Sequence, residues 1–136
     1  MDKLQGKRIF VVEDNLANLA VFATALQKQG AIVIQDNWNL QTAELLTRSL
    51  PIDLILMDIM LKGGITGYDI FDALQSNPQL KNIPVVAVSS LDAEQEIPKA
   101  RAKGFAGFIG KPISLMKFPD YLAACIQGEK VWVASW

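Results

Sequence analysis

Three acidic residues and one lysine stand directly behind short apolar runs that have the length of buried strands. Glu13 and Asp14 follow the first run, Asp58 follows the second, and Lys111 follows a third and precedes Pro112. In an open parallel sheet, ligands bind at the edge where the strands have their carboxyl ends. Three carboxylates and one ammonium at that edge would form an acidic pocket for a hard cation, with a lysine beside it.

Carboxylates that are packed together repel each other, so the pKa of one or more of them would rise unless a cation neutralised the charge. Mg²⁺ takes oxygen ligands, keeps some of its waters, and is usually held by one or two carboxylates together with phosphate oxygens. Glu13, Asp14 and Asp58 match that requirement and predict a site for Mg²⁺ or Mn²⁺. For each acid taken singly, the alternative is a solvated side chain at the end of a loop.

The composition excludes several other classes of function. The 136 residues, of which 51% are apolar, fit one compact domain with a core of its own. A net charge of −1 gives no basic surface for direct contact with nucleic acid. The apolar stretches fall far short of the ~20 residues that a membrane span needs, so we expect no membrane insertion. The sequence has no histidine, which removes the commonest general base and most zinc chemistry.

The single cysteine and the start of the chain indicate a cytoplasmic protein. Cys125 has no partner within the chain for a disulfide, which suits a reducing compartment. Its spacing from Phe118 and Leu122 places it on the inner stripe of a helix, where it would fill the core. Residues 1–8 lack the apolar core of a signal peptide.

Strand-like runs alternate five times with helix-like segments, and the runs are continuously apolar, as in strands that are buried on both faces. Such repeats predict an α/β protein of the flavodoxin-like (βα)5 type, a doubly wound five-stranded parallel sheet of order 2-1-3-4-5 with helices on both faces. The switch point of this order lies between strands 1 and 3, which carry Glu13, Asp14 and Asp58. The predicted strands are Arg8–Val12, Ala31–Gln35, Asp53–Met57, Val85–Ser89 and Phe105–Ile109.

Capping residues indicate where the helices begin. Asp14 or Asn15 is placed to cap the first helix, Asn39 the second, and Asp92 the fourth, while Thr66 opens the third. We expect the domain to span residues 1–128. A tail of residues 129–136, with Trp132, Ala134 and Trp136 on one face, would lie beyond the fold. It could dock on its own domain, pair with an exposed sheet edge, or fray.

Four motifs in the right order and spacing resemble those of the receiver domain of two-component response regulators, of the single-domain, CheY-like type. The resemblance covers about residues 7–127. The motifs are Val12-Glu-Asp-Asn15, Leu56-Met-Asp-Ile59, Ile83-Pro-Val-Val-Ala-Val-Ser89 and Gly110-Lys-Pro-Ile113.

The resemblance implies that Asp58 takes a phosphoryl group from the phosphohistidine of a histidine kinase or a histidine phosphotransfer protein and becomes an aspartyl phosphate. It also implies that Asp14, Asp58 and the backbone carbonyl of Met60 bind Mg²⁺ directly, and that Glu13 acts through water. Lys111 would pair with Asp58 at rest and with a phosphoryl oxygen afterwards.

The resemblance further implies a switch. Ser89 would rotate its hydroxyl toward the phosphoryl group, and Phe108 would swing inward behind it. The bond between Lys111 and Pro112 would be cis and would position the lysine. The simpler interpretations are a hydroxyl at a strand end for Ser89 and a core aromatic for Phe108.

The sequence departs from the family pattern in two places. Lys62 stands where relatives usually carry a proline, and the stretch 62–67 is one residue longer than usual, so we expect a mobile loop. Pro98 lacks the amide that would complete the fourth helix, which predicts a helix that is short, kinked or late to begin. The face of the fourth helix, fifth strand and fifth helix commonly carries output or dimer contacts, and Pro98 puts the usual dimer in doubt.

Two apolar neighbours of the site predict slow loss of the phosphoryl group. Met60 lies two residues after Asp58, and Leu91 lies two residues after Ser89. Neither side chain can orient a water molecule, and both would shield the phosphoryl group from attack. We therefore expect slow autodephosphorylation, at the long end of the family's range.

The leading hypothesis is a stand-alone phosphorylation switch that acts on an effector by protein contact and catalyses only its own phosphorylation and dephosphorylation. A homodimer is one option for its assembly. The alternative is a pseudo-receiver, a binding module that needs no phosphate. A metal-dependent phosphohydrolase would need a second acid at the position of Met60. A flavin carrier would need a phosphate cradle where Glu13 and Asp14 stand.

Overall fold

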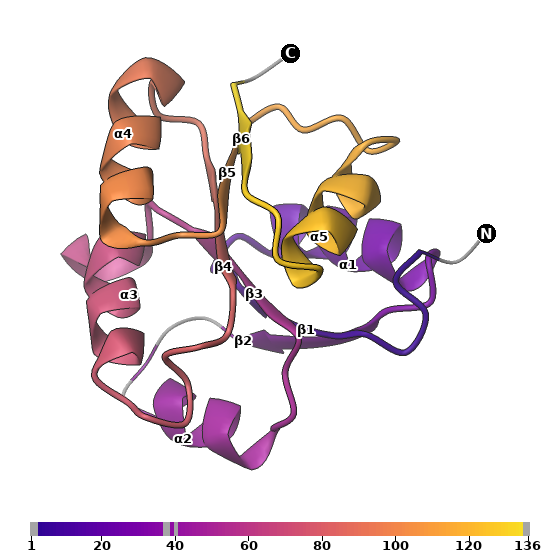
Figure 1. Ribbon diagram of the computed structural model, residues 1–136, viewed down its shortest axis with the longest axis horizontal. Helices are drawn as coiled ribbons and strands as arrows, with labels where there is room; N and C mark the ends of the chain where they lie inside the picture. The colour runs from indigo at the N-terminus through magenta and orange to yellow at the C-terminus, as the bar shows by residue number, and fades with distance from the viewer. Residues whose placement is uncertain (1–2, 37–38, 40, 135–136) are drawn as a thin grey trace.

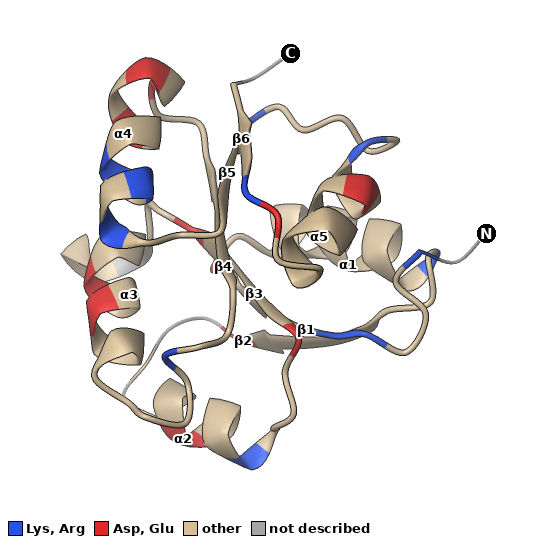
Figure 2. Cartoon of the chain, viewed as in Figure 1, with Lys and Arg blue, Asp and Glu red and all other residues tan. Residues whose placement is uncertain are grey.

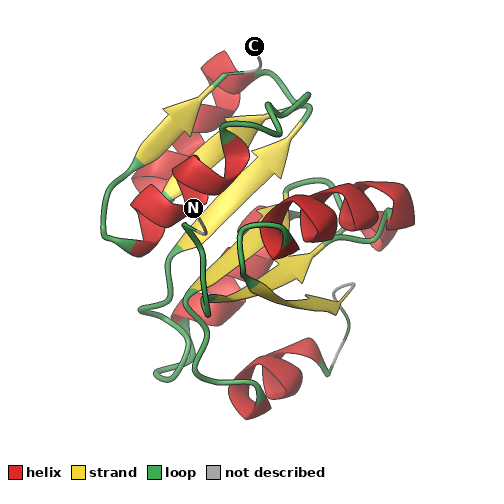
Figure 3. Cartoon of the chain, turned by 90° about the vertical axis from the view of Figure 1, so that its right-hand side faces the viewer, coloured by secondary structure: helices red, strands yellow, loops and turns green. Residues whose placement is uncertain are grey.

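Six parallel strands form one sheet at the centre of the protein, and helices cover both of its faces (Figures 1 and 3). The computed structural model describes residues 3–36, 39 and 41–134. The sheet order is β2-β1-β3-β4-β5-β6, so the predicted order 2-1-3-4-5 is confirmed and one strand is added. The strands are β1 (Arg8–Val12), β2 (Ile32–Asp36), β3 (Leu54–Asp58), β4 (Val85–Ser89), β5 (Gly107–Gly110) and β6 (Val131–Val133).

The helices divide between the two faces of the sheet. Two of them lie on one face and three on the other, as Figure 1 shows. On the first face are α1 (Leu16–Gln27) and α5 (Phe118–Ile126); on the second are α2 (Thr42–Arg48), α3 (Gly67–Gln75) and α4 (Ala93–Lys103). A short 3-10 helix, η1 (Lys62–Gly64), lies between β3 and α3.

Alternate residues of each central strand point to opposite faces, and both faces are covered. In β1, Ile9 and Val11 belong to the cluster under α1 and α5, whereas Phe10 and Val12 belong to the cluster on the other face. All four side chains are at most 1% exposed, which explains why the strands are apolar without alternation.

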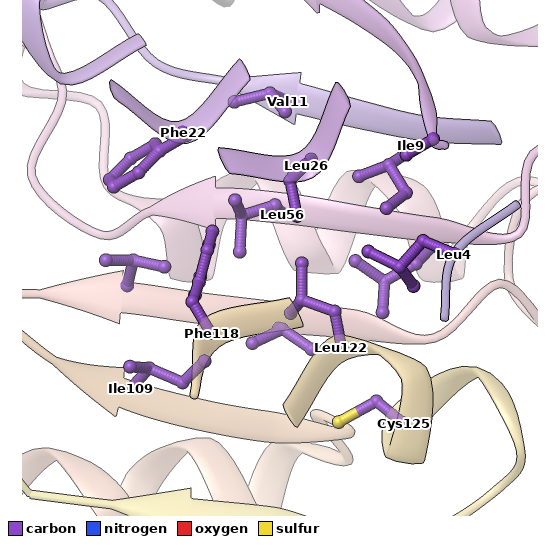
Figure 4. Close-up of a cluster of buried hydrophobic side chains, with 14 of the residues drawn as sticks. Leu4, Ile9, Val11, Phe22, Leu26, Leu56, Ile109, Phe118, Leu122 and Cys125 are labelled. Carbon is purple, nitrogen blue, oxygen red and sulfur yellow. The ribbon is translucent and has the colours of Figure 1, made fainter. Parts of the chain in front are cut away.

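The core under α1 and α5 is made of interlocking side chains from both helices. Figure 4 shows Phe22 and Leu26 of α1 and Phe118 and Leu122 of α5 gathered with side chains of the strands. The rings of Phe22 and Phe118 are tilted against each other with their centroids 5.6 Å apart. Cys125 lies in the same cluster, and burial raises the pKa of its thiol to about 11, so the predicted role as core filler is confirmed.

Three of the predicted helix starts are confirmed by their hydrogen bonds. The Asn15 side chain accepts a hydrogen bond from the Asn18 amide at 3.0 Å, and Asp92 accepts one from the Glu94 amide at 3.0 Å. Thr66 and Asp69 form a reciprocal capping box at the start of α3. Acidic residues in the first turn of α4 and basic residues in its last turn complement the helix dipole (Figure 2).

The predicted start of α2 is wrong, because Asn39 does not cap this helix. The side chain of Asn39 accepts a hydrogen bond from the Gln41 amide at 2.8 Å, which forms a turn before the helix. The N-cap residue is Gln41, without a capping hydrogen bond from its side chain.

Two of the three alternatives predicted for the fourth helix, a short helix and a late start, are wrong, while a kink at Pro98 stays a prediction. It begins directly after the predicted cap Asp92 and runs for 11 residues with Pro98 inside. Proline at this position removes the amide that would bond the carbonyl of Glu94. Both residues are exposed, so water can satisfy that carbonyl.

The tail predicted for residues 129–136 does not lie beyond the fold where the structure describes it. Val131–Val133 form β6, which pairs in parallel with β5 and extends the sheet. Docking of the tail on its own domain, one of the three alternatives, is thus what occurs; Trp136 lies outside the described residues. No helix of the described chain is long and apolar enough to cross a membrane.

We expect Phe118→Ala to lower the free energy of unfolding by about 3–5 kcal/mol, because the side chain is fully buried between α1 and the sheet. Met116→Ala, at a side chain that is 90% exposed, serves as the control and should change little. Urea unfolding followed by circular dichroism measures both values. Equal effects of the two substitutions would contradict this account of the core.

Candidate functional site

The ends of four neighbouring strands place the predicted site residues at one edge of the sheet. Glu13 follows β1, Asp58 is the last residue of β3, and Ser89 is the last residue of β4. Lys111 follows β5, and its amide donates to the carbonyl of Ser89 at 2.8 Å. The strand pairing therefore converts four separate sequence positions into one site.

An ion pair joins the lysine to the acid of β3. The Nζ of Lys111 lies 2.8 Å from Oδ2 of Asp58 and 4.0 Å from Oε1 of Glu13. The other oxygen of Asp58, Oδ1, accepts a hydrogen bond from the Met60 amide at 2.9 Å. The Asp58 residue is 8% exposed, so it is held on two sides but is still reachable from solvent.

Glu13 is buried and only partly satisfied. Its Oε1 accepts a hydrogen bond from the side-chain amide of Asn18 at 2.9 Å, whereas Oε2 is buried and has no hydrogen-bond partner among the described residues. The pKa of Glu13 is raised to about 7, chiefly by burial and also by the neighbouring Asp58, while Asn18 and Lys111 act against the rise. A buried carboxylate oxygen without a donor fits a cation, or a water molecule bound to a cation.

The expected cluster of three carboxylates is not assembled in this conformation. Among the residues that the structure describes, no three His, Cys, Asp or Glu side chains are grouped so as to hold a metal ion. Glu13, Asp58 and Lys111 are brought together, and Asp14 is half-buried beside Glu13 at the end of β1. The ammonium of Lys111 supplies the charge that reduces repulsion between the two buried acids. The oxygen donors nevertheless fit Mg²⁺ in kind.

The proposed switch residues occupy well-defined places. Ser89 is fully buried, and its Oγ accepts a hydrogen bond from the Leu91 amide at 3.0 Å. Phe108 is also fully buried, on the face covered by α3 and α4, so its ring is already inward. The peptide bond between Lys111 and Pro112 is cis, the geometry that the resemblance implies.

The two residues expected to slow dephosphorylation lie at the surface. Met60 is 57% exposed and Leu91 is 37% exposed. The Met60 amide donates a hydrogen bond to Asp58, and the Leu91 amide donates one to Ser89. The backbone of each residue is therefore fixed at the site while its side chain extends outward. The loop between Met60 and α3 turns at Gly63 and Gly64, both with positive φ.

Sequence reasoning missed two residues that support the site. Asn18 orients Glu13, and its position in the first turn of α1 is the only signal that the sequence offers. Gly67 allows α3 to approach the end of β3, because a Cβ at this position would lie 2.9 Å from the carbonyl oxygen of Asp58. No local pattern in the sequence reveals this close approach.

The arrangement can support phosphoryl transfer to a carboxylate. Such a reaction requires positioning and charge neutralisation more than covalent work from the protein. Asp58 offers a carboxylate that is held by a backbone amide, Lys111 supplies a positive charge, and Ser89 supplies a hydroxyl on the neighbouring strand.

The chain is similar to known proteins in both sequence and structure. The family model for the response regulator receiver domain matches residues 9–123. The polar-differentiation response regulator DivK of Brucella ovis is 32% identical over 112 residues, which are 82% of this chain and 89% of that protein.

Two solved structures show the same fold. A response regulator from Desulfuromonas acetoxidans superposes with a TM-score of 0.78 at 30% identity, covering 89% of this chain and 97% of that one. The receiver domain of a sensor histidine kinase from Pseudomonas aeruginosa PAO1 superposes with a TM-score of 0.77 at 23% identity, covering 90% and 99%. That domain has a magnesium ion coordinated in its active-site cleft.

A double-mutant cycle should separate the buried ion pair from an exposed one of similar length. For Lys111→Met and Asp58→Asn, we expect a coupling energy of about 1–3 kcal/mol, because the two side chains are only 20% and 9% exposed. Lys3 and Asp120 lie 2.7 Å apart with exposures of 53% and 49%, and should couple by less than about 1 kcal/mol. Urea unfolding of the four proteins in each cycle gives both energies. Equal coupling would show that burial does not strengthen the pair at the site.

Proposed function

This chain belongs to the family of response regulator receiver domains of two-component signalling, and from that premise we propose that phosphorylation of Asp58 switches it. The observation that carries the proposal is the contact between Asp58 and Lys111, 2.8 Å between Oδ2 and Nζ, at the carboxyl edge of the sheet. It holds the acceptor beside the positive charge that a transferred phosphoryl group requires.

In the proposed reaction, a carboxylate oxygen of Asp58 attacks the phosphorus of a phosphohistidine. The bond between phosphorus and the histidine nitrogen breaks as the bond between phosphorus and oxygen forms, and the bonding electrons leave with the nitrogen. Lys111 then pairs with a phosphoryl oxygen instead of the free carboxylate. The Met60 amide, 2.9 Å from Oδ1, orients the carboxylate for attack.

We assign a Mg²⁺ or Mn²⁺ ion to this site, held by Asp14, Asp58 and the Met60 carbonyl, with Glu13 acting through water. When bound, the ion supplies charge neutralisation for the phosphoryl oxygens. The unpartnered Oε2 of Glu13 and the magnesium ion in the Pseudomonas aeruginosa receiver domain support the assignment.

The switch residues have defined parts in the proposal. Ser89 gives up the hydrogen bond from the Leu91 amide when its hydroxyl turns toward the phosphoryl group. Phe108 needs no swing from solvent, because its ring is already buried, and it acts as the packing element behind Ser89. We therefore propose no inward movement of Phe108, because its ring is already inward at rest.

Receiver domains act between histidine kinases and effectors. For this chain, we assign the donor as a histidine kinase or a histidine phosphotransfer protein, and the output as protein contact through the face of α4, β5 and α5, in the cytoplasm. Its own phosphorylation and slow dephosphorylation would be its only catalysis. A phosphate-independent module would not require Asp58, Lys111 and Ser89 together.

We expect the intact protein to gain the mass of one phosphate when it is incubated with acetyl phosphate and Mg²⁺. Acetate is the leaving group, and the gain should disappear in Asp58→Asn and after chelation of Mg²⁺. Intact-protein mass spectrometry makes the measurement. A gain that survives Asp58→Asn would refute the assignment of the acceptor, and no gain in the wild type would favour the phosphate-independent module.

The phosphorylated protein should lose its phosphate slowly, with a half-life longer than seconds, because apolar side chains stand at the mouth of the site. Met60→Gln should speed the loss about tenfold, equivalent to about 1.4 kcal/mol in the barrier, because an amide can orient the attacking water. The decay of the phosphorylated mass over time gives the rate. Met116→Gln, an equally polar change away from the site, should leave it unchanged; a half-life of seconds in the wild type would contradict the shielding role.

A further inference from the structure

The sixth strand covers the edge of the sheet at which output contacts are expected. In β6, Val131, Trp132 and Val133 pair in parallel with Gly107, Phe108 and Ile109 of β5. Figures 1 and 3 show β6 at the end of the sheet, between α4 and α5. The face formed by α4, β5 and α5 is therefore occupied by a segment of the same chain.

β5 is shaped to receive this segment. A Cβ at Gly107 would lie 2.7 Å from the carbonyl oxygen of Val131, so the close approach of β6 depends on the absence of a side chain there. Trp132 packs against the cluster that contains Phe108, and the guanidinium of Arg101 lies 5.0 Å from the centre of its ring. The docked position of β6 thus rests on specific contacts to β5 and to α4.

β6 is nevertheless held less firmly than the other strands. It has three residues, all of them only partly buried, whereas β5 beneath it is fully buried. Elements with few buried contacts at the edge of a sheet open at a lower free-energy cost than core strands do. Release of β6 would expose the backbone edge of β5 without unfolding the rest of the sheet.

The residue that follows β6 also lines a pocket together with the segment of the site that would change on phosphorylation. A pocket of about 300 Å³ is lined by residues 90–94, by Gly110 and Lys111, and by Ala134 just after β6. The segment that begins at residue 90 is held by the hydrogen bond from the Leu91 amide to Ser89. When the hydroxyl of Ser89 turns away, the Leu91 amide loses its acceptor. The pocket wall made by residues 90–94, which shares the pocket with Ala134, is then no longer held by this hydrogen bond.

We propose that β6 is a displaceable cover of the β5 edge, that phosphorylation of Asp58 weakens its docking, and that an extended segment of the effector then takes its place. The inference rests on the proposed function of Asp58. The effector segment would run parallel to β5 and carry an aromatic residue at the place of Trp132, where the contacts of Phe108 and Arg101 fit such a side chain.

Hydrogen exchange of the full chain tests the proposal. The backbone amides of residues 131–133 should exchange about tenfold faster after treatment with acetyl phosphate and Mg²⁺, within the usual range of coupling between two sites. The amides of β1 and β3 should not change. Asp58→Asn should show no acceleration under the same treatment. In Trp132→Ala, the amides of residues 131–133 should exchange rapidly with or without phosphorylation. In Trp132→Phe, the dependence of their exchange rate on phosphorylation should be restored.

The mass of the same sample separates a failure of the displaceable cover from a failure of the acceptor assignment. A phosphate gain without faster exchange at residues 131–133, or with equal acceleration throughout the sheet, overturns the displaceable cover and leaves the acceptor assignment intact. No phosphate gain overturns both.

A labelled peptide with the sequence of residues 129–134 serves as the probe for the exposed edge. It should bind the phosphorylated full chain about tenfold more tightly than the unphosphorylated chain, as measured by fluorescence anisotropy. A peptide with alanine in place of its tryptophan should not show this difference. Equal binding of the first peptide to both forms would overturn the proposed effector contact.

Discussion

The contact between Lys111 and Asp58 is the interaction on which the rest of the site depends. Two acids lie close together at the buried ends of β1 and β3, and one of them, Glu13, has a buried oxygen that no donor of the described chain reaches. The ammonium of Lys111, which follows β5 on the far side of β4, lies 2.8 Å from Asp58. This contact offsets the repulsion between Glu13 and Asp58 and so stabilises the arrangement. The lysine reaches that position only because β3, β4 and β5 are neighbours in the sheet. The balance of charge at this edge of the sheet therefore depends on the order of the strands in the core.

Most of the fold could be predicted from the sequence, because local patterns carried the necessary information. The strands that are buried on both faces appear as continuous apolar runs, and caps such as Asn15 and Asp92 mark helix starts through hydrogen bonds within a single turn. The errors arose where one local sequence pattern is compatible with two different structures. Asn39 bonds the backbone of a turn instead of a helix, and Pro98 is accommodated in a helix where the affected carbonyl belongs to an exposed residue. The sixth strand was left undecided because pairing with β5 depends on the missing side chain of Gly107, and no local pattern reveals that requirement.

The candidate site was predictable in its residue types and in their positions at strand ends, but less so in its geometry. That acids and a lysine meet at one edge follows from parallel topology, whereas the roles of Ser89 and Phe108 come from the resemblance alone. The resemblance implied that Lys111 pairs with Asp58 at rest, as the structure has it. The sequence could not show that the three carboxylates are not gathered, because their grouping depends on side-chain positions. Asn18 and Gly67 escaped notice for the same reason, since their importance lies in contacts with residues on other elements.

The parallel direction of β6 changes where the chain leaves the domain. After α5 the chain lies at the amino edge of the sheet, away from the acidic site. β6 carries it back across the sheet, so that Ala134 shares a pocket with Lys111 and Leu91. A fluorescent protein, an affinity tag or a second domain joined behind this strand would therefore emerge next to the acidic site. A reporter joined at the amino terminus would keep that entrance clear, because Leu4 is anchored by its amide to the carbonyl of Gln29, before the start of β1.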